Sequence, residues 1–412
     1  MTGFKETEIG LLPEEWQVVR LADFIDFQRG SEPGSDNYND NEDGIRFLRI
    51  VDLSGSRKVN IYTTANNLKK CNEDDILITL DGSIGIVRKG LKGAYSSGIR
   101  KVVINKDDLI SDFVFFCLQT NYIQQVIHKY ASGVTIKHAS KAIPHFLIPL
   151  PKKEEQYNIA HILSQIQSAI ETQEKIIQTT TEFKKALMQK LFTEGLKGEP
   201  QKETEIDLVP ESWEVKSIVE IGSKFIGGGT PSTKMSDYWG GDIPWTTSKR
   251  LSDNLYLNDG EKQITKLGLE NSSTHLVPKN SLIVSTRVTV GKVIINSIDI
   301  AINQDLTGIV IDSNKYNGQF LAYQIKTNRV QRIFESYKRG ATIRGITRED
   351  LKGIKLAVPK LSEQREIANV LNTTDKKIIT AMQKRDVLQT LFKSMLHHLM
   401  TGQIRVKDFK LA

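Results

Sequence analysis

The chain has 412 residues, more than one hydrophobic core usually serves, so two domains are expected. Hydrophobic residues make up 39% and charged residues 25%, which excludes disordered and collagen-like proteins, and the net charge of +7 permits a polyanionic partner without requiring one. Two cysteines, Cys71 and Cys117, cannot form a disulfide scaffold or a four-ligand zinc site. No apolar run approaches the roughly 18 residues of a membrane span, and Met1–Glu8 does not resemble a signal peptide. These features predict a soluble, cytoplasmic protein.

Three segments of the first half recur in the second half, in the same order. The pairs are 7–18 with 204–215, 133–137 with 340–344, and 151–163 with 359–371. The first pair is identical at eight of twelve positions, and the offset between copies rises from 197 to 208 residues. The second copy therefore has a slightly longer middle. A period close to half the chain indicates a tandem duplication rather than a solenoid.

Each copy begins with short strands and turns and ends in a long helix. Strands are predicted at Ile76–Leu80, Lys101–Ile104, Phe146–Leu150, Ser281–Ser285 and Gly308–Ile311. Short helices are predicted at 112–125 and 319–334. Glycine and proline are absent from Lys152 to Glu194 and from Lys360 to Thr401, so each of these stretches is predicted to be one helix. The predicted fold class is α+β, with two tandem α/β globules related by a pseudo-twofold.

Both long helices carry residues at alternating spacings of four and three, which predicts a coiled-coil seam. The apolar positions that we expect to form the seam or to dock other subunits are Ile159, Leu163, Ile166, Ile170, Ile177 and Leu187 in the first helix, and Ile367, Leu371, Ile378, Leu388, Phe392 and Leu399 in the second. Polar residues interrupt the seam at Gln173, Thr180, Lys184 and Arg385, where they would fix the register or contact a partner. The alternative is two independent amphipathic helices, each packed on its own globule.

The order of the segments decides how the helices would pair. The first helix leads from globule one to globule two, so a second helix that pairs along its length must run antiparallel. At 1.5 Å per residue, such helices would form a spacer of about 60 Å. Two diverged globules at a fixed separation suit duplex DNA, where half-sites recur about every 34–36 Å along one face. Because the middles of the two copies differ most, the predicted target is asymmetric.

The diverged middles contain side chains and glycines suited to reading DNA. Arginine pairs with guanine and glutamine with adenine, whereas lysine, serine, threonine and glycine amides hold phosphates. The candidate DNA-binding residues are Arg29, Arg46, Arg49, Ser83, Thr135 and Lys137 in the first copy, and Gly229, Thr230, Lys249, Arg250, Arg287, Gln304, Thr342 and Arg344 in the second. For any one of them, a solvated loop side chain remains the alternative.

Motifs for catalysis are missing from the sequence. There is no Pro-Pro pair, and thus no Asp/Asn-Pro-Pro-Tyr motif of amino-methyltransferases, and no phosphate-binding loop. The histidines and cysteines show no metal-ligand spacing. We therefore expect no catalytic residue, no metal site and no cofactor on this chain.

Taken together, the motifs resemble those of the specificity subunits of type I restriction-modification systems, over essentially the whole chain. The resemblance rests on Leu12–Trp16 and Val209–Trp213, Gly240–Trp245, the two Gly-x-Thr segments at 133 and 340, and the Pro…Glu-Gln…Ile-Ala segments at 151–160 and 359–368. The first half departs from the pattern at Asp43–Arg49, which replaces the Gly-Asp-Ile-Pro-Trp sequence of the second half.

The resemblance implies a division of the chain and a set of partners. Residues 1–151 and 196–359 would be target recognition domains, 152–195 and 360–402 the spacer helices, and 403–412 a tail. The chain would be the non-catalytic subunit that binds a bipartite double-stranded DNA target and docks two methylation subunits. Those subunits bind S-adenosylmethionine and methylate adenine N6, and restriction subunits that use ATP and magnesium would join them. The alternatives are a stand-alone nucleic-acid-binding architectural protein and an unrecognised enzyme.

Overall fold

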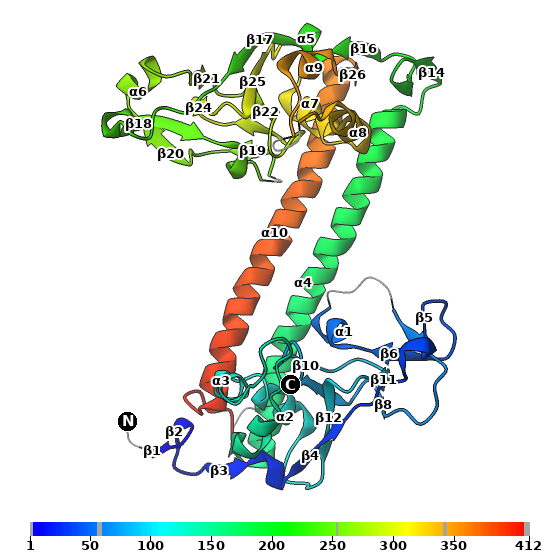
Figure 1. Ribbon diagram of the computed structural model, residues 1–412, viewed down its shortest axis with the longest axis vertical. Helices are drawn as coiled ribbons and strands as arrows, with labels where there is room; N and C mark the ends of the chain where they lie inside the picture. Colours follow the sequence, from blue (N-terminus) through cyan, green and yellow to red (C-terminus); the bar gives the residue numbers. More distant parts are fainter. Residues whose placement is uncertain (1–2, 56–59, 253, 341–343, 408–412) are drawn as a thin grey trace. The chain divides into compact units, whose positions relative to one another are not determined.

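A computed structural model describes residues 3–55, 60–252, 254–340 and 344–407. The chain forms two compact units. Unit 1 comprises Met1–Glu174 with Met382–Ala412, and unit 2 comprises Lys175–Ala381. Two long helices, α4 (Lys153–Glu194) and α10 (Leu361–Met400), each contribute one part to each unit (Figure 1).

Unit 1 contains two main sheets and two small strand pairs. The main sheets have the orders β10-β9-β12-β4 and β5-β7-β6-β11-β8, and the pairs are β1-β2 and β13-β3. The strands are β1 (Phe4–Thr7), β2 (Gly10–Pro13), β3 (Gln17–Arg20), β4 (Ile25–Arg29), β5 (Tyr38–Asn39), β6 (Ile45–Leu48), β7 (Tyr62–Thr63), β8 (Lys70–Cys71), β9 (Ile76–Thr79), β10 (Val87–Arg88), β11 (Gly93–Tyr95), β12 (Ile99–Ile104) and β13 (Leu147–Leu150). The helices are α1 (Ile50–Ser54), α2 (Ser111–Cys117) and α3 (Asn121–Lys129), with 3-10 turns η1 (Leu21–Asp23), η2 (Ser35–Asn37) and η3 (Ser140–His145).

Unit 2 repeats this plan. Its main sheets have the orders β17-β25-β22-β23-β19 and β20-β18-β24-β21, and its strand pairs are β14-β15 and β16-β26. The strands are β14 (Gln201–Thr204), β15 (Asp207–Pro210), β16 (Glu214–Ser217), β17 (Gly222–Gly227), β18 (Trp239–Thr246), β19 (Tyr256–Leu257), β20 (Lys262–Ile264), β21 (Leu276–Val277), β22 (Leu282–Ser285), β23 (Val293–Asn296), β24 (Ile300–Ile302), β25 (Leu306–Ile311) and β26 (Lys355–Val358). The helices are α5 (Ile218–Ile221), α6 (Lys266–Glu270), α7 (Gly318–Ile325), α8 (Asn328–Tyr337) and α9 (Arg348–Gly353), with 3-10 turns η4 (Ser236–Tyr238) and η5 (Ser248–Arg250).

Most strand pairings of the two units correspond, but among the described residues the parallel pair β19-β23 occurs in unit 2 alone. The antiparallel pairs β4-β12 and β12-β9 match β17-β25 and β25-β22, and the parallel pair β6-β11 matches β18-β24. The predicted duplication and the α+β class are therefore confirmed. The match of β6 with β18 also places Asp43–Arg49, where the sequence departs from the second copy, at the equivalent strand.

The motif that opens each half anchors its unit. Trp16 is 1% exposed and Trp213 is fully buried, and each belongs to the main hydrophobic core of its unit. A glycine that ends a long helix lies against each tryptophan, Gly402 beside Trp16 and Gly195 beside Trp213. Both glycines have positive φ, +65° and +67°, which is the left-handed conformation that ends many helices. The repeated Pro-Glu-x-Trp sequence is thus a docking point for the end of a long helix.

Short helices form at 112–125 and 319–334 as predicted, and each segment contains parts of two of them. The break falls at Thr120 in unit 1 and at Thr327 in unit 2, where the backbone is extended. The Thr120 hydroxyl donates to the Cys117 carbonyl at 2.7 Å, and the Thr327 hydroxyl donates to the Gln324 carbonyl at 2.6 Å. These bonds satisfy the carbonyls at the helix ends and compete with continuation of the helix.

The two long helices pack together in both units. In unit 1, Ile159 and Leu163 near the start of α4 share a core with Leu399 near the end of α10. In unit 2, Leu191 near the end of α4 shares a core with Ile367 and Leu371 near the start of α10. The start of each helix therefore packs beside the end of the other, which confirms the antiparallel arrangement.

The expected seam residues lie on the covered sides of the helices. Ile159, Leu163, Ile367, Leu371 and Leu399 are buried, and Ile166, Ile170, Ile177, Leu187, Ile378, Leu388 and Phe392 are half-buried. Of the polar positions, Gln173 is buried and Thr180, Lys184 and Arg385 are half-buried. The Lys184 ammonium group contacts the Asp375 carboxylate of α10 at 2.5 Å, so this polar position links the helices within unit 2. Arg385 instead pairs with its neighbour Asp386.

Candidate nucleic-acid interface

Five equivalent loops meet in each unit, at one end of the sheet that contains β9 in unit 1 and β22 in unit 2. In unit 1 they are 29–32, 48–52, 80–85, 96–98 and 132–138; in unit 2 they are 227–230, 246–250, 286–291, 303–305 and 339–345, of which 341–343 lie outside the described residues. We call these the reading loops. Each set contains a segment that follows the central strand (β9 or β22) and a segment that carries the Gly-x-Thr motif. The duplication therefore brings equivalent, diverged loops to one place in each unit.

Backbone hydrogen bonds join the reading loops in the same way twice. In unit 1 the amides of Leu80 and Asp81 donate to the Gly98 carbonyl, and the Ala139 amide donates to the Leu80 carbonyl at 2.7 Å. In unit 2 the amides of Thr286 and Arg287 donate to the Asp305 carbonyl, and Ile346 donates to the Thr286 carbonyl at 2.9 Å. These bonds hold the motif segment beside the segment after the central strand, which gives side chains on separate loops a common platform.

One glycine in each set is required by a close approach of two backbones. A Cβ atom on Gly30 would lie 2.2 Å from the Ser96 carbonyl oxygen, and one on Gly228 would lie 2.0 Å from the Ile302 carbonyl oxygen. Both glycines follow the equivalent strands, β4 and β17. Only glycine permits this approach. Gly228 therefore forms a packing contact between the loop at 227–230 and the segment that follows β24.

A buried carboxylate organises the loops of unit 1. Asp81 is 8% exposed and accepts hydrogen bonds from Arg100 Nη2 at 3.0 Å and from His138 Nδ1 at 2.8 Å. The Arg29 guanidinium lies 3.9 Å from the same carboxylate, with 63% of its side chain exposed. One acidic group thus fixes three basic groups from three segments, and Arg29 presents its free face to solvent.

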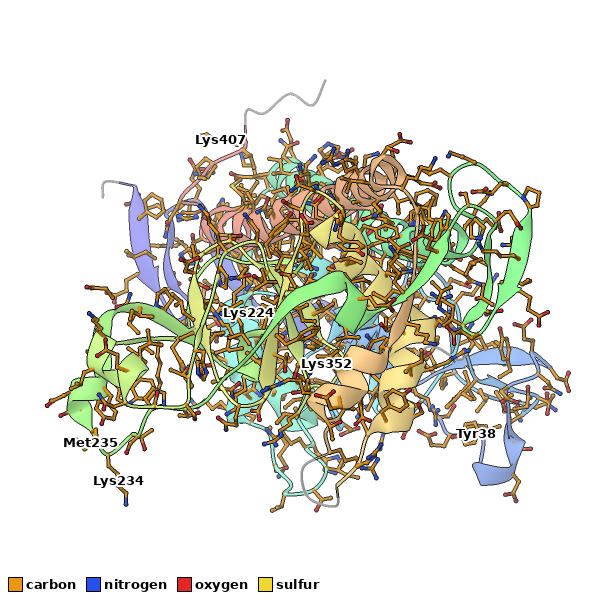
Figure 2. All side chains as sticks on the ribbon, turned by 90° about the horizontal axis from the view of Figure 1, so that it is seen from above. Tyr38, Lys224, Lys234, Met235, Lys352 and Lys407 are labelled. Carbon is orange, nitrogen blue, oxygen red and sulfur yellow. The ribbon has the colours of Figure 1, made fainter. Side chains whose placement is uncertain are left out.

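The loops of unit 1 border a groove of about 770 Å³. Arg29, Arg49, Glu32, Asp81 and His138 line it, together with Ile136 of the motif loop. The Arg49 guanidinium lies 5.9 Å from the ring centroid of Tyr38, which Figure 2 marks. Basic side chains thus border a concave surface made only of unit 1 residues.

The predicted residues of unit 1 divide into two groups. Arg29 and Arg49 line the groove, and Ser83, Thr135 and Lys137 are exposed on the adjacent reading loops. Arg46 does not line it, and its guanidinium lies 3.5 Å from the Asp52 carboxylate. The sequence interpretation missed Arg100 and Glu32, which hold the loops through Asp81 and Ser97. An arginine at the start of the apolar strand β12 was the available signal for Arg100.

The predicted residues of unit 2 also divide. The Thr230 hydroxyl donates to the Gln304 side-chain oxygen at 2.8 Å, which joins two reading loops. Lys249, Arg287 and Arg344 are exposed on three further reading loops, and Arg250 is exposed but pairs with Asp259 at 2.8 Å. Thr342 lies outside the described residues.

Gly229 cannot hold a phosphate as the sequence interpretation expected. It is buried; its amide donates to the Ile302 carbonyl, and its carbonyl accepts a bond from Trp245 Nε1 at 3.1 Å. Both backbone polar groups are therefore used inside the unit.

In the described ranges, no group of three or more His, Cys, Asp or Glu side chains is placed to hold a metal ion. Within the same ranges, no helix is both long and apolar enough to cross a bilayer.

The fold and its loops define a duplicated recognition protein, and the comparisons place it in a family. Residues 13–181 and 210–390 match the family model described as the type I restriction modification DNA specificity domain. The chain belongs to the family of type I restriction-modification specificity subunits. Members of this family recognise DNA sequence, are non-catalytic and have no cofactor of their own.

Two curated relatives come from Methanocaldococcus jannaschii. The specificity subunit of the type I restriction enzyme MjaVIII is 30% identical, over 98% of this chain and 97% of the relative. The putative specificity subunit of the enzyme MjaX is 29% identical over the same shares. Among solved structures, the type I restriction-modification S subunit from M. genitalium matches with a TM-score of 0.65 and 16% identity, covering 93% of this chain and 96% of that one. That last likeness concerns the fold alone.

Proposed function

We propose that each unit reads one half-site of a bipartite, asymmetric target in duplex DNA. The observation that carries the proposal is that identical backbone bonds hold two loop sets whose side chains differ. Arg29 in unit 1 corresponds to Gly227 in unit 2, and Gln304 in unit 2 corresponds to Ser97 in unit 1. The group offered to a base edge in one unit is therefore replaced by a different group, or by none, at the equivalent place in the other unit, so the two units select different base edges.

The reading residues are the exposed polar side chains of the reading loops. In unit 1 they are Arg29, Ser83, Thr135 and Lys137, together with the half-buried Arg49 of the groove, and in unit 2 they are Thr230, Lys249, Arg250, Arg287, Gln304 and Arg344. Arginine donates two bonds to guanine, and glutamine both donates to and accepts from adenine. Lysine and the hydroxyl residues hold phosphates and set the register of the unit on the duplex. Arg46 is left out because its guanidinium is paired with Asp52, and Gly229 because both of its backbone polar groups are bonded inside the unit.

The helices α4 and α10 set the spacer between half-sites and dock two methylation subunits. Large apolar side chains remain exposed on their outer faces, away from the seam: Phe183 is 58% exposed and Leu391 is 43% exposed. These two residues are 208 positions apart, the same offset as the two helices, so each helix exposes an apolar side chain at the equivalent place for a methylation subunit to cover.

The chemistry resides in the partners. Methylation subunits supply S-adenosylmethionine and transfer its methyl group to adenine N6, and restriction subunits supply the ATP- and magnesium-dependent cleavage. This chain contributes position: it holds the duplex so that the target adenines of the two half-sites face the two methylation subunits. Titration of the DNA complex with salt should show a steep slope, because several reading residues displace counterions from phosphates.

The test is methylation of DNA by the reconstituted complex. The pure chain alone should transfer no methyl group, and the chain mixed with its partner methyltransferase should methylate adenines in one bipartite motif. Arg287→Ala should reduce methylation about 10-fold or more and relax one position of one half-site. Lys315→Ala is the matched control, because this exposed cation lies at the opposite end of β25 from the reading loops and should leave methylation unchanged.

Two results would contradict the proposal. Methyl transfer by the pure chain would show an enzyme. Binding that is steeply salt-dependent, indifferent to sequence and unaccompanied by methylation in the mixture would show a stand-alone architectural protein.

A further inference from the structure

The segment after β22 contains a strained valine. Val288 has φ +62°, a left-handed conformation that β-branched residues almost never adopt. The Thr289 amide donates to the Arg287 carbonyl at 2.7 Å, so Val288 is the central residue of a γ-turn. Val288 is 59% exposed, so burial of apolar surface compensates little of the strain. Strain of this kind persists where surrounding contacts impose it, and it gathers at sites that bind a ligand.

Surrounding hydrogen bonds impose this conformation. The Arg287 carbonyl accepts a second bond, from the Ser285 hydroxyl at 2.7 Å, and the Thr289 hydroxyl donates to Ser285 Oγ at 3.1 Å. The Gly291 amide closes the turn by donating to the Ser285 carbonyl at 3.0 Å. Val288 is therefore fixed at the tip of a closed turn, and its side chain has a defined direction.

Unit 1 builds the equivalent turn without strain. Gly82 occupies the position of Val288 and has φ +74°, which glycine adopts at little cost. A Cβ atom on Gly82 would lie 2.9 Å from Ile50 Cδ1, so the isoleucine side chain covers this place. In unit 2 the residue that corresponds to Ile50 is Ser248, which is too short to do so. Both units thus have an apolar group at this turn, but in unit 2 the group is the exposed valine.

We propose that Val288 contacts the 5-methyl group of a thymine in the second half-site. This inference rests on the proposed function and names one base feature that unit 2 reads. Val288 lies between Arg287 and Thr289, on a reading loop whose other exposed groups are polar. The thymine methyl is the apolar feature on the base edges of the major groove, so it is the group that an exposed isopropyl side chain matches.

The contact has a measurable size. Removing one methyl group from an apolar contact weakens binding about fourfold. Replacing thymine by deoxyuridine deletes only this methyl group and leaves base pairing and the hydrogen-bonding edge intact. At one thymine of the second half-site, deoxyuridine should therefore raise the dissociation constant of the complex with its methylation subunits about fourfold.

Two variants separate the contact from the fold. Val288→Ala should bind thymine and deoxyuridine targets equally. Val288→Gly should show the same loss of discrimination, and it should also raise the melting temperature of unit 2 by about 2–4 °C, because glycine relieves the strain. Val219→Ala truncates another exposed valine of unit 2, on α5, and should keep the fourfold discrimination.

The outcomes are distinct. If the wild-type complex is insensitive to deoxyuridine at every thymine of the second half-site, if that half-site contains no thymine, or if Val288→Ala keeps full discrimination, the contact is overturned while the proposed function stands. If Val288→Gly lowers the melting temperature, the argument from strain is overturned. A complex that methylates no DNA motif would overturn the proposed function itself, and the Val288 contact with it.

Discussion

A polar cluster in unit 2 makes a quantitative prediction about the seam. Asp375 of α10 accepts a bond from Lys184 of α4 at 2.5 Å and from the Tyr323 hydroxyl of α7 at 2.7 Å. The side chains of Lys184 and Asp375 are 19% and 23% exposed. Burial, followed by the bond to Asp375, raises the pKa of Tyr323, so this hydroxyl remains a donor at neutral pH.

Breaking the cluster should be costly. In Asp375→Asn the Lys184 ammonium loses its counter-charge, and in Lys184→Met the Asp375 carboxylate keeps only the tyrosine. Removing one partner of a buried pair costs about 3–5 kcal/mol, and the partial exposure here reduces this to about 2–3 kcal/mol. For a unit of this size, that loss lowers the melting temperature by about 5–10 °C.

The equivalent place in unit 1 supplies a designed control. Phe392, Phe116 and Gln167 correspond to Lys184, Tyr323 and Asp375, and the two phenylalanine rings lie 6.0 Å apart. The triple variant Lys184→Phe/Tyr323→Phe/Asp375→Gln therefore introduces into unit 2 the three side chains that unit 1 has at the equivalent positions. Replacing a buried ion pair by apolar groups is often neutral. This variant should come within about 1 kcal/mol of the wild type.

Amide hydrogen exchange is the suitable assay, because it reports on each unit separately. In either single variant, peptides from 175–194 and 361–381 should exchange about 30- to 100-fold faster, while peptides from β9 and β12 in unit 1 should be unchanged. A triple variant as unstable as the single variants would refute the reasoning that the aromatic and polar arrangements are equivalent. Single variants without effect would refute the role of the pair.

Three further predictions concern unit 1, the reading loops and the helices. Arg405 donates to the buried Glu155 at 2.8 and 2.9 Å; burial raises the pKa of this carboxyl, but the bonds from Arg405 and Trp16 outweigh burial and lower it. Arg405→Ala should therefore destabilise unit 1 by about 3 kcal/mol at pH 7, as measured by thermal unfolding. This loss of stability should shrink as the pH falls below 4.5, the ordinary pKa of a glutamate, because Glu155 is then protonated. An equal loss at pH 3 would contradict the prediction. Gly228→Ala should abolish methylation of the target, whereas Gly353→Ala, where a Cβ meets no atom within 4 Å, should not, and equal activities would disprove the close approach. Deleting one heptad from α4 and the matching heptad from α10 removes about 10 Å of helix, so the target spacer should shorten by about three base pairs with unchanged half-sites; an unaltered spacer in methylation maps would disprove the spacer role.

The duplication, the strands and the long helices could be predicted because each of them depends on a local sequence pattern. The repeated Pro-Glu-x-Trp segments and the stretches without glycine or proline depend only on neighbouring residues. The helix breaks at Thr120 and Thr327 could not be predicted from periodicity alone, because the apolar pattern continues through them. A threonine hydroxyl that bonds a carbonyl three residues earlier is the deciding contact.

The candidate site was predictable in its loops but not in its individual roles. The motif segments indicated which loops meet, but Arg46 and Gly229 make their contacts within the fold. Arg46 pairs with Asp52 and Gly229 accepts a hydrogen bond from Trp245, and no local sequence pattern predicts these contacts. The conformation of Val288 is equally hidden, because a valine in sequence predicts a strand and not a left-handed turn.

The most direct test of the central claim is an exchange of the second recognition segment. Residues 207–359 would be replaced by the corresponding segment of a relative that methylates a different target, and methylated adenines would be mapped genome-wide in cells that carry the complete system. The account predicts that one half-site changes to that of the donor, while the other half-site and the spacer stay the same. A change in both half-sites, or in neither, would contradict the claim that each unit reads its own half of the target.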